Sequence, residues 1–154
     1  MAFHIVLVEP EIPANTGNIA RSCAATGTCL HLVRPLGFST DDKTLKRAGL
    51  DYWHAVKVYY YDSFQEVKEN YKGHHFYCAT TKASKYYTEF QYQDEDFFVF
   101  GKETKGLPPD ILEEHSDTCL RLPMSEEVRS LNLSNSAAIV LYEGLRQIGF
   151  LGLK

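Results

Sequence analysis

The stretch Leu120–Gly149, LRLPMSEEVRSLNLSNSAAIVLYEGLRQIG, decides how the rest of the chain is interpreted. It predicts a short apolar strand, a polar loop, and then a helix from Ser136 to Ile148. This helix is apolar on nearly every side, which is typical of a helix buried in its own fold or against a partner. Ser134 and Asn135 belong to the residue types that cap a helix start, and Gly149 belongs to the type that ends one.

The polar loop in front of this helix, Ser130–Asn135, alternates hydrogen-bonding and apolar side chains. Open α/β folds place ligand contacts in polar loops that follow a strand and lead into a helix. We therefore expect a ligand site at this loop, with the rest of the chain supplying a sheet and further loops to it.

Short apolar runs alternate with helical segments along the remainder of the chain. The expected strands are Phe3–Val8, Cys29–Val33, Lys57–Tyr61, His75–Ala79, Asp96–Phe100 and Thr118–Leu122. The expected helices are Asn15–Ala25, Asp41–Ala48, Ser63–Tyr71 and Pro108–His115. Pro10 and Pro13 favour a stiff loop over residues 9–14. The alternation predicts an α/β fold with a mostly parallel sheet and helices on both faces, in a single domain of residues 1–154.

The bulk composition limits the function classes. The 154 residues are 44% hydrophobic and 23% charged, as in a soluble globular protein. No apolar run approaches the roughly 18 residues of a membrane helix, and no signal peptide is evident. The four scattered cysteines form no C-x-x-C pair, so we expect a reduced, cytoplasmic protein. The net charge of −4 argues against a protein that coats nucleic acid through bulk charge, although a local basic patch is compatible with it.

Three glycine- or asparagine-rich loops follow expected strands: residues 15–18, 101–107 and 130–135. Gly101 and Gly106 either let a flat ligand approach the backbone or simply make turns. Arg21 either meets a phosphate at the start of a helix or is an ordinary surface arginine. The chain lacks the dinucleotide and Walker fingerprints, so these loops do not indicate nucleotide-cofactor or NTP binding.

Two other features receive no role from the sequence. His74 and His75 are adjacent, so on a strand they point to opposite faces, and we expect no metal site. The tyrosine runs at 59–61 and 86–87 either stack on bases or are half-buried structural residues.

The three loops together resemble the three motifs of the SPOUT-class RNA 2′-O-ribose methyltransferases. The motifs are Asn15–Arg21 (NTGNIAR), Phe100–Leu107 (FGKETKGL) and Arg129–Ser136 (RSLNLSNS). Val8–Pro13 (VEPEIP) and Arg47–Tyr52 (RAGLDY) look like one branch of that class. This branch is the tRNA (cytidine/uridine-34) 2′-O-methyltransferases, which modify the wobble nucleotide of the anticodon.

The resemblance covers the whole chain and implies a fold, a cofactor and partners. It implies a deep trefoil knot in the C-terminal part, no separate RNA-binding domain, and a homodimer formed through the C-terminal helix. The cofactor would be S-adenosyl-L-methionine, and the substrate would be the anticodon stem-loop of tRNA, with cytidine or a modified uridine at position 34. The cofactor contacts implied by the resemblance are Ala79, Thr80, Gly101, Glu103, Leu122, Ser130, Leu131 and Asn135.

The resemblance also implies which residues act on the substrate. The residues placed around the transferred methyl group are Arg21, Asn18, Glu103, Ser130 and Asn135. We expect Arg21 to hold a phosphate or the ribose oxygen, because a guanidinium keeps its proton and makes a poor base. The expected RNA contacts are Arg21, Lys43, Lys46, Arg47, Lys82, Lys85, Lys102, Lys105, Arg129 and, across a dimer, Tyr142.

Three alternatives stay open. The motifs are shared across the class, so the target could be another tRNA position or ribosomal RNA. A non-catalytic RNA-binding module with the same fold is the second alternative, and the intact motif residues count against it. A small-molecule α/β enzyme is the third, weakened by the absence of a nucleotide fingerprint and of a nucleophile set.

Overall fold

The computed structural model describes residues 2–39, 41–49 and 53–154, apart from the side chains of Lys46 and Gly49. Its strands are β1 (His4–Val8), β2 (Cys29–Val33), β3 (Val58–Tyr61), β4 (Phe76–Ala79), β5 (Phe97–Phe100) and β6 (Cys119–Leu120). Its helices are α1 (Pro13–Thr26), α2 (Lys43–Gly49), α3 (Phe64–Asn70), α4 (Pro109–Glu114) and α5 (Leu133–Gln147), with short 3₁₀ turns at Trp53–Ala55 and Ser116–Thr118. Residues 50–52 of the branch-like segment lie outside the described residues.

The six strands form one sheet in the order β3-β2-β1-β5-β4-β6. Every pairing among the described strands is parallel, which confirms the predicted parallel sheet. Parallel neighbours need long connections, and most of these connections carry a helix. The chain leaves β1 toward β2 and β3, then crosses to the other side of β1 for β4 and β5. The carboxyl ends of β1 and β5 therefore flank a point where the strand order reverses, which is where α/β sheets place ligands.

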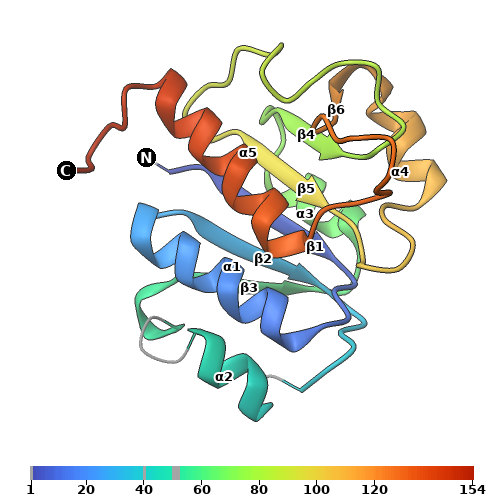
Figure 1. Ribbon diagram of the computed structural model, residues 1–154. Helices are drawn as coiled ribbons and strands as arrows, with labels where there is room; N and C mark the ends of the chain where they lie inside the picture. The colour runs from blue at the N-terminus through green and yellow to red at the C-terminus, as the bar shows by residue number, and fades with distance from the viewer. Residues whose placement is uncertain (1, 40, 50–52) are drawn as a thin grey trace.

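Helices cover both faces of the sheet, as predicted. Ile19 of α1 and Val140 of α5 belong to the larger buried cluster, and Val67 of α3 and Ile111 of α4 belong to the cluster on the opposite face. Figure 1 shows α1 and α5 side by side in front of the strands, with α3 and α4 behind. The two helices that carry the first and third motifs thus share one face.

Helix α1 begins earlier than the sequence predicted. Pro13 is its first residue, although the two prolines favoured an irregular loop through residue 14. The reason is that the fixed φ of proline suits the first helical position, where its missing N–H has no intrahelical partner. The helix ends as expected at Gly27, which has φ 68° and lies in the left-handed region.

Helix α5 is capped by Asn132, so the prediction that Ser134 and Asn135 cap it was wrong. The Asn132 side chain accepts a hydrogen bond from the Asn135 N–H (3.2 Å), and residues 134 and 135 lie inside the first turn. Ile139 and Tyr142 are 38% and 46% exposed on the side of α5 that faces away from the core. The apolar surface of α5 is therefore only partly covered within one chain.

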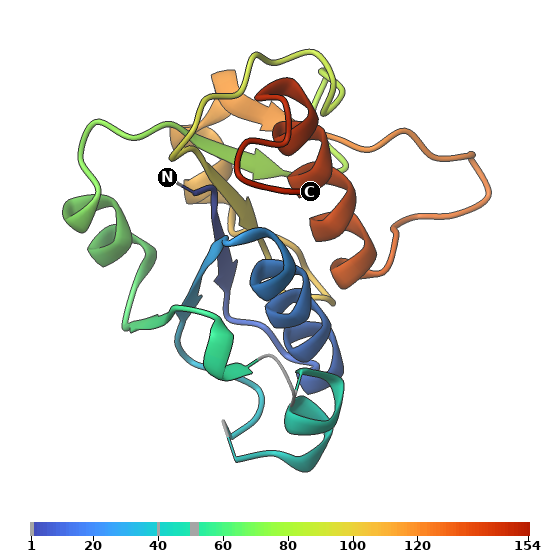
Figure 2. The same cartoon turned by 90° about the vertical axis from the view of Figure 1, so that its left-hand side faces the viewer.

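The strand predicted at Thr118–Leu122 is shorter than expected. Strand β6 contains only Cys119 and Leu120, and from there a loop runs to Asn132 and returns to the middle of the molecule at α5. Figure 2 shows this loop extending away from the sheet. The knot implied by the family resemblance stays a prediction.

A chain of buried hydrogen bonds links the first three strands through His4 of β1, His31 of β2 and Tyr61 of β3. His4 Nδ1 lies 2.9 Å from His31 Nε2, and His31 Nδ1 lies 2.8 Å from the Tyr61 hydroxyl. Burial lowers the pKa of His31 to about 3, so the ring is neutral near pH 7 and serves packing.

The adjacent histidines have protein partners. His74 contacts the Glu95 carbonyl oxygen and His75 contacts the Asp96 carboxylate, at 3.0 and 3.1 Å. Among the described residues, no group of three or more His, Cys, Asp or Glu side chains is arranged to hold a metal ion. None of the described helices is long and apolar enough to cross a membrane.

Candidate active site

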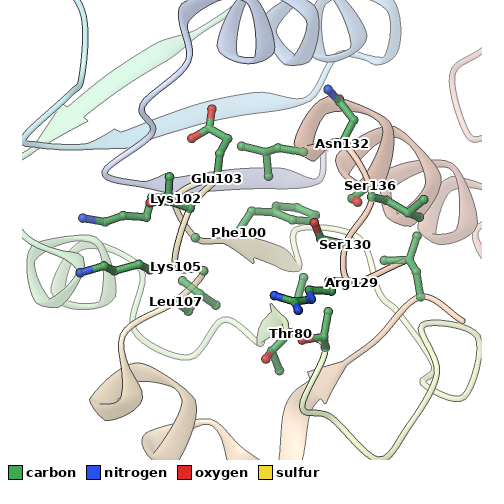
Figure 3. Close-up of a pocket in the computed structure, with 18 of the residues that line it drawn as sticks. Thr80, Phe100, Lys102, Glu103, Lys105, Leu107, Arg129, Ser130, Asn132 and Ser136 are labelled. Carbon is green, nitrogen blue, oxygen red and sulfur yellow. The ribbon is translucent and has the colours of Figure 1, made fainter. Parts of the chain in front are cut away.

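A cavity of about 570 Å³ lies beyond the carboxyl ends of β4, β5 and β6 (Figure 3). Its walls come from the loops that follow these three strands, namely residues 79–82, 100–107 and 121–133. This volume is within the usual range for small-molecule sites, roughly 300–1,000 Å³. The cavity therefore joins the second and third motifs, and Asn15 of the first motif also lines it.

The wall at Gly101–Leu107 is a closed turn. The Gly106 N–H donates to the Lys102 carbonyl oxygen (2.8 Å), and Gly106 has φ 69°. A Cβ added at Gly101 would lie 2.1 Å from the carbonyl carbon of Gly106, far inside contact distance. Of the two interpretations of this glycine pair, the structure shows the turn: the backbone of Gly106 and Leu107 packs directly against Gly101 and leaves no room for a side chain there.

The opposite wall, the loop from Leu122 to Leu131, is held much more loosely. Its one backbone–backbone hydrogen bond within the described parts of the chain runs from the Val128 N–H to the Ser125 carbonyl oxygen (3.4 Å). Leu122 is only 6% exposed, yet no hydrogen bond of the described residues uses its N–H or C=O. Buried main-chain groups normally have partners, so this wall leaves polar groups available to a ligand.

Glu103 uses both carboxylate oxygens to hold the first motif. Oε1 accepts from the Glu11 N–H (2.8 Å), and Oε2 accepts from the Ile12 N–H (2.9 Å). The Asn15 side-chain amide also donates to Oε2 (3.2 Å). The carboxylate therefore binds the entrance of α1, while the residue itself lines the cavity.

Asn15 joins all three motifs and was absent from the residues predicted to form the site. It is 6% exposed, donates to Glu103, and accepts from the Asn132 side-chain amide (3.1 Å). Its position as the first residue of the first motif was the signal that could have identified it. Its two partners are 88 and 117 residues away in the chain, so no local pattern reveals them.

The cavity is lined by more basic than acidic side chains. The basic residues are Lys82, Lys102, Lys105, Arg121 and Arg129. Glu103 is the one acidic residue among the described residues of the lining, and its carboxylate is already hydrogen-bonded. In Figure 3, Lys102 and Lys105 project to the same side, and Arg129 lies near Ser130 and Thr80. An acidic protein thus carries a local cationic surface suited to an anionic ligand.

The predicted site residues divide into two sets. The predicted cofactor contacts that line the cavity are Ala79, Thr80, Gly101, Glu103, Leu122, Ser130 and Leu131. The remaining one, Asn135, lies outside it on α5, as does Tyr142, and both are exposed. Asn18 and Arg21 are exposed on α1 and are likewise not part of the lining. The helices that carry these four residues pack against each other.

The predicted RNA contacts are also divided. Lys82, Lys102, Lys105 and Arg129 line the cavity. Lys43 and Arg47 are exposed on α2, away from the lining, and the side chain of Lys46 lies outside the described residues. Lys85 Nζ lies 5.3 Å from the centre of the Phe90 ring.

Several lining residues were not predicted as site residues. The apolar ones are Ile12, Phe100, Leu107, Leu112, Met124 and Leu133. Their sequence pattern is that of ordinary core residues, so only the meeting of the loops in space identifies them.

Comparison with known proteins gives the family. The sequence model described as the SpoU rRNA Methylase family matches residues 2–142. A tRNA (cytidine(34)-2′-O)-methyltransferase of Methylovorus glucosotrophus is 50% identical over 151 residues, covering 97% of this chain and 98% of that protein. A Bacillus subtilis relative, named provisionally for the same activity, is 61% identical over 157 residues, covering 100% and 98%.

Solved structures agree with the sequence match. A Bacillus anthracis protein, described provisionally as an RNA methyltransferase, is 59% identical with a TM-score of 0.93, covering 99% of this chain and 98% of that one. A structure solved to explain 2-OH methylation of C/U34 on tRNA is 40% identical with a TM-score of 0.92, covering 96% of each chain. The match of the family and of these relatives over nearly the whole length confirms the resemblance seen in the motifs, and the chain belongs to the SpoU rRNA methylase family.

Proposed function

We propose that the protein transfers a methyl group from S-adenosyl-L-methionine to the 2′-hydroxyl of the wobble nucleotide of tRNA, a cytidine or modified uridine at position 34. One observation carries the proposal. Loops from the second and third motifs meet in one cavity, tied by Asn15 to the first, in a chain 50% identical over almost its full length to a tRNA (cytidine(34)-2′-O)-methyltransferase.

The cavity fits the methyl donor. Leu107, Leu122 and Leu133 offer apolar contacts for the faces of a purine, and the unpaired main-chain groups of loop 122–131 suit its polar edge. The hydroxyls of Thr80 and Ser130 are available for a ribose. When bound there, the donor supplies a methyl group that its sulfonium already activates, so the chain needs to orient the reactants and exclude water.

Arg21 and Asn18 are assigned to the acceptor. A guanidinium is permanently charged and presents several donors in a fixed plane, so Arg21 is suited to holding a phosphate or the ribose oxygen. Ser130 and Asn135 frame the other side of the reacting groups in this proposal. Because Asn18, Arg21 and Asn135 lie outside the cavity of one chain, the acceptor site needs a further surface.

A homodimer formed through α5 supplies that surface in our proposal. Ile139 and Tyr142 are exposed on α5, beside the helix that carries Arg21. A two-fold interface buries the same apolar strip on both copies. Such an interface brings Asn18, Arg21 and Asn135 of one protomer close to the second protomer. Tyr142 of the second protomer is then available to contact RNA.

We assign the RNA-binding surface to the basic side chains that line the cavity. The other described basic residues predicted to contact RNA lie outside the cavity lining. A dimer doubles this local cationic surface, so RNA binding relies on the patch and not on the net charge of the chain, which is −4. The proposal places donor binding, catalysis and RNA binding in one domain. Because tRNA functions in translation, it places the protein in the cytoplasm.

The test is methyl transfer from labelled S-adenosyl-L-methionine to total tRNA from a strain that lacks this gene, with the product mapped to a nucleotide. Label on the 2′-oxygen of nucleotide 34 is the expected result. Label at another tRNA position or in ribosomal RNA would keep the reaction and overturn the target. An absence of label, with the donor still bound, would favour a non-catalytic RNA-binding module.

A further inference from the structure

At the entrance to the cavity, two loops are joined by glutamate side chains, each of which accepts hydrogen bonds from the other loop. Glu103, from the loop after β5, accepts the N–H groups of Glu11 and Ile12, from the loop after β1. In return, Glu11 Oε1 accepts the Thr104 N–H (3.0 Å) and the Thr104 hydroxyl (2.8 Å). We call this reciprocal set of hydrogen bonds the loop clasp. Each carboxylate holds the main chain of the other loop.

The loop clasp replaces the usual cap of α1. Ile12 is the N-cap residue of α1 and has no side-chain acceptor, and the first turn of this fully described helix contains no acidic residue. The N–H groups at the start of a helix need acceptors, and a negative charge there is stabilising. The Glu103 carboxylate, 91 residues away in the chain, meets that need. The position of α1 is thus tied to the loop that walls the cavity.

The loop carrying Glu11 is strained in a way that the clasp can maintain. Glu9 has φ 54°, in the left-handed region that is unfavourable for a non-glycine residue. Its N–H donates to the Val33 carbonyl oxygen (2.9 Å), and its carboxylate lies 3.5 Å from Lys102 Nζ. Such conformations persist where the surroundings hold them, and here Lys102 adds a third link between the two loops.

The two loops differ in how far their own hydrogen bonds hold their shape. Residues 102–106 close on themselves through the Gly106–Lys102 hydrogen bond, so the cavity wall keeps its shape without help from outside. The hydrogen bonds from Thr104 lower the pKa of the Glu11 carboxyl below its usual value, which keeps it an ionised acceptor at neutral pH. The clasp therefore acts on where the start of α1 lies, more than on the shape of the cavity.

We propose that Glu11 and Thr104 are positioning residues, and that the loop clasp sets α1, with Asn18 and Arg21, against the methyl-donor cavity. This rests on the proposed function, which places Arg21 at the acceptor. The clasp gives Glu103 a positioning role as well, because both of its oxygens accept N–H groups at the entrance of α1. Loss of the clasp slows methyl transfer while the donor still binds.

The experiment is a double-mutant cycle of Glu11→Ala and Thr104→Val. Thr104→Val removes the hydroxyl and keeps the shape and the N–H. We expect Glu11→Ala to lower kcat by about tenfold and Thr104→Val by about threefold, since the first removes the acceptor of two hydrogen bonds and the second removes one donor. The double variant should be no slower than Glu11→Ala, because the hydroxyl has then already lost its acceptor. The Kd for S-adenosylhomocysteine should change by less than about twofold.

Two further variants test whether the effect of Glu11 comes from its hydrogen bonds, from its charge, or from the stability of the fold. Glu11→Gln keeps an oxygen that accepts from Thr104, so it should retain kcat within about twofold of the wild type. Glu113→Ala is the matched control, since Glu113 is exposed on α4 and has no side-chain hydrogen bond to any described residue. Independent, multiplicative effects of the two substitutions would overturn the proposal. So would a Glu11→Gln variant as slow as Glu11→Ala, or rates that simply follow a fall in Tm.

Amide hydrogen exchange tests the clasp without methylation. In the wild type, S-adenosylhomocysteine should slow exchange at the N–H groups of Glu11 and Ile12, and this effect should be absent in Glu11→Ala. Unchanged exchange on binding would overturn the coupling. If the wild type bound the donor analogue and showed this protection but methylated no tRNA, the proposed function would fall and the clasp would stand.

Discussion

The motif residues occupy two regions. In one of them a single chain forms a cavity, and in the other it leaves the residues exposed on its surface. The cavity region is built from loops that contact one another through Glu103, Asn15 and Asn132. The outer region consists of exposed residues on neighbouring faces of α1 and α5, including Arg21 and Tyr142. One region is a formed site with a volume and a lining, and the other is a surface.

This difference teaches that donor binding and methyl transfer have different structural requirements. The cavity forms within one chain, so in our proposal donor affinity is a property of the protomer. In our proposal, transfer also needs the outer region, whose polar side chains would become a site only when RNA and a second copy of the chain meet them. Variants in the two regions should therefore separate affinity from rate.

The largest effect is expected when the cavity region is broken at Gly101. In Gly101→Ala the new Cβ would lie 2.1 Å from the Gly106 carbonyl carbon and 2.2 Å from the Leu107 nitrogen, so the backbone must move. We expect the affinity for S-adenosylhomocysteine to fall by more than about 100-fold, with methylation lost; titration calorimetry measures the first. Gly106→Ala meets no atom within 4 Å and carries only the cost of its positive φ, so it should lose less than about tenfold. Equal losses would show that crowding at Gly101 is not the reason.

The next effect should separate the two regions. We expect Arg21→Ala to lower kcat/KM by more than about 100-fold, because a charged group that positions the acceptor is removed. The Kd for S-adenosylhomocysteine should stay within about twofold of the wild type, since Arg21 does not line the cavity. Single-turnover methylation and calorimetry on the same preparation measure both. A parallel loss of donor affinity would remove the distinction between the regions.

Several residues that line the cavity could be identified from the sequence where the signal was local. Gly101 directly follows β5 and Leu122 lies shortly after β6, at the edge where parallel sheets place their ligands. Asn15 was missed because its role depends on Glu103 and Asn132, which approach it only after the sheet has formed. The cap of α5 was misplaced because Asn132, Ser134 and Asn135 are all capping types. Which of the three caps the helix depends on the backbone geometry at the start of α5, and the sequence does not show that geometry.

The outer region was predicted through the family resemblance alone. An arginine on the exposed side of a helix has no local pattern that distinguishes a catalytic role from an ordinary surface role. The same holds for Tyr142, whose exposure acquires meaning only if a second chain covers α5. Residues whose partners belong to another molecule are the ones that a single sequence, or a single chain, describes least.

A smaller effect is expected from a variant that would separate the protomers of the proposed homodimer. Ile139→Asp places a charge on the exposed apolar strip of α5, where Ile139 is 38% exposed. We expect sedimentation to show a monomer at micromolar concentration, with methylation reduced by about tenfold or more and donor affinity retained. Val128→Asp is the control, since Val128 is 51% exposed but lies in the loop before α5. A monomeric wild type would contradict the assignment of α5 as the interface.

The smallest effect is expected from single cations around the cavity, and it tests how far the RNA surface extends. Lys105→Ala should weaken tRNA binding a few-fold and reduce the slope of log affinity against log salt by roughly 0.7–0.9, the contribution of one phosphate contact. Arg47→Ala removes a cation from α2, which does not line the cavity, and should change the slope less. Filter binding over a range of salt concentrations measures both slopes. Equal changes would extend the RNA surface from the cavity to α2, whereas an unchanged slope in Lys105→Ala would mean that the cavity cations serve only the donor.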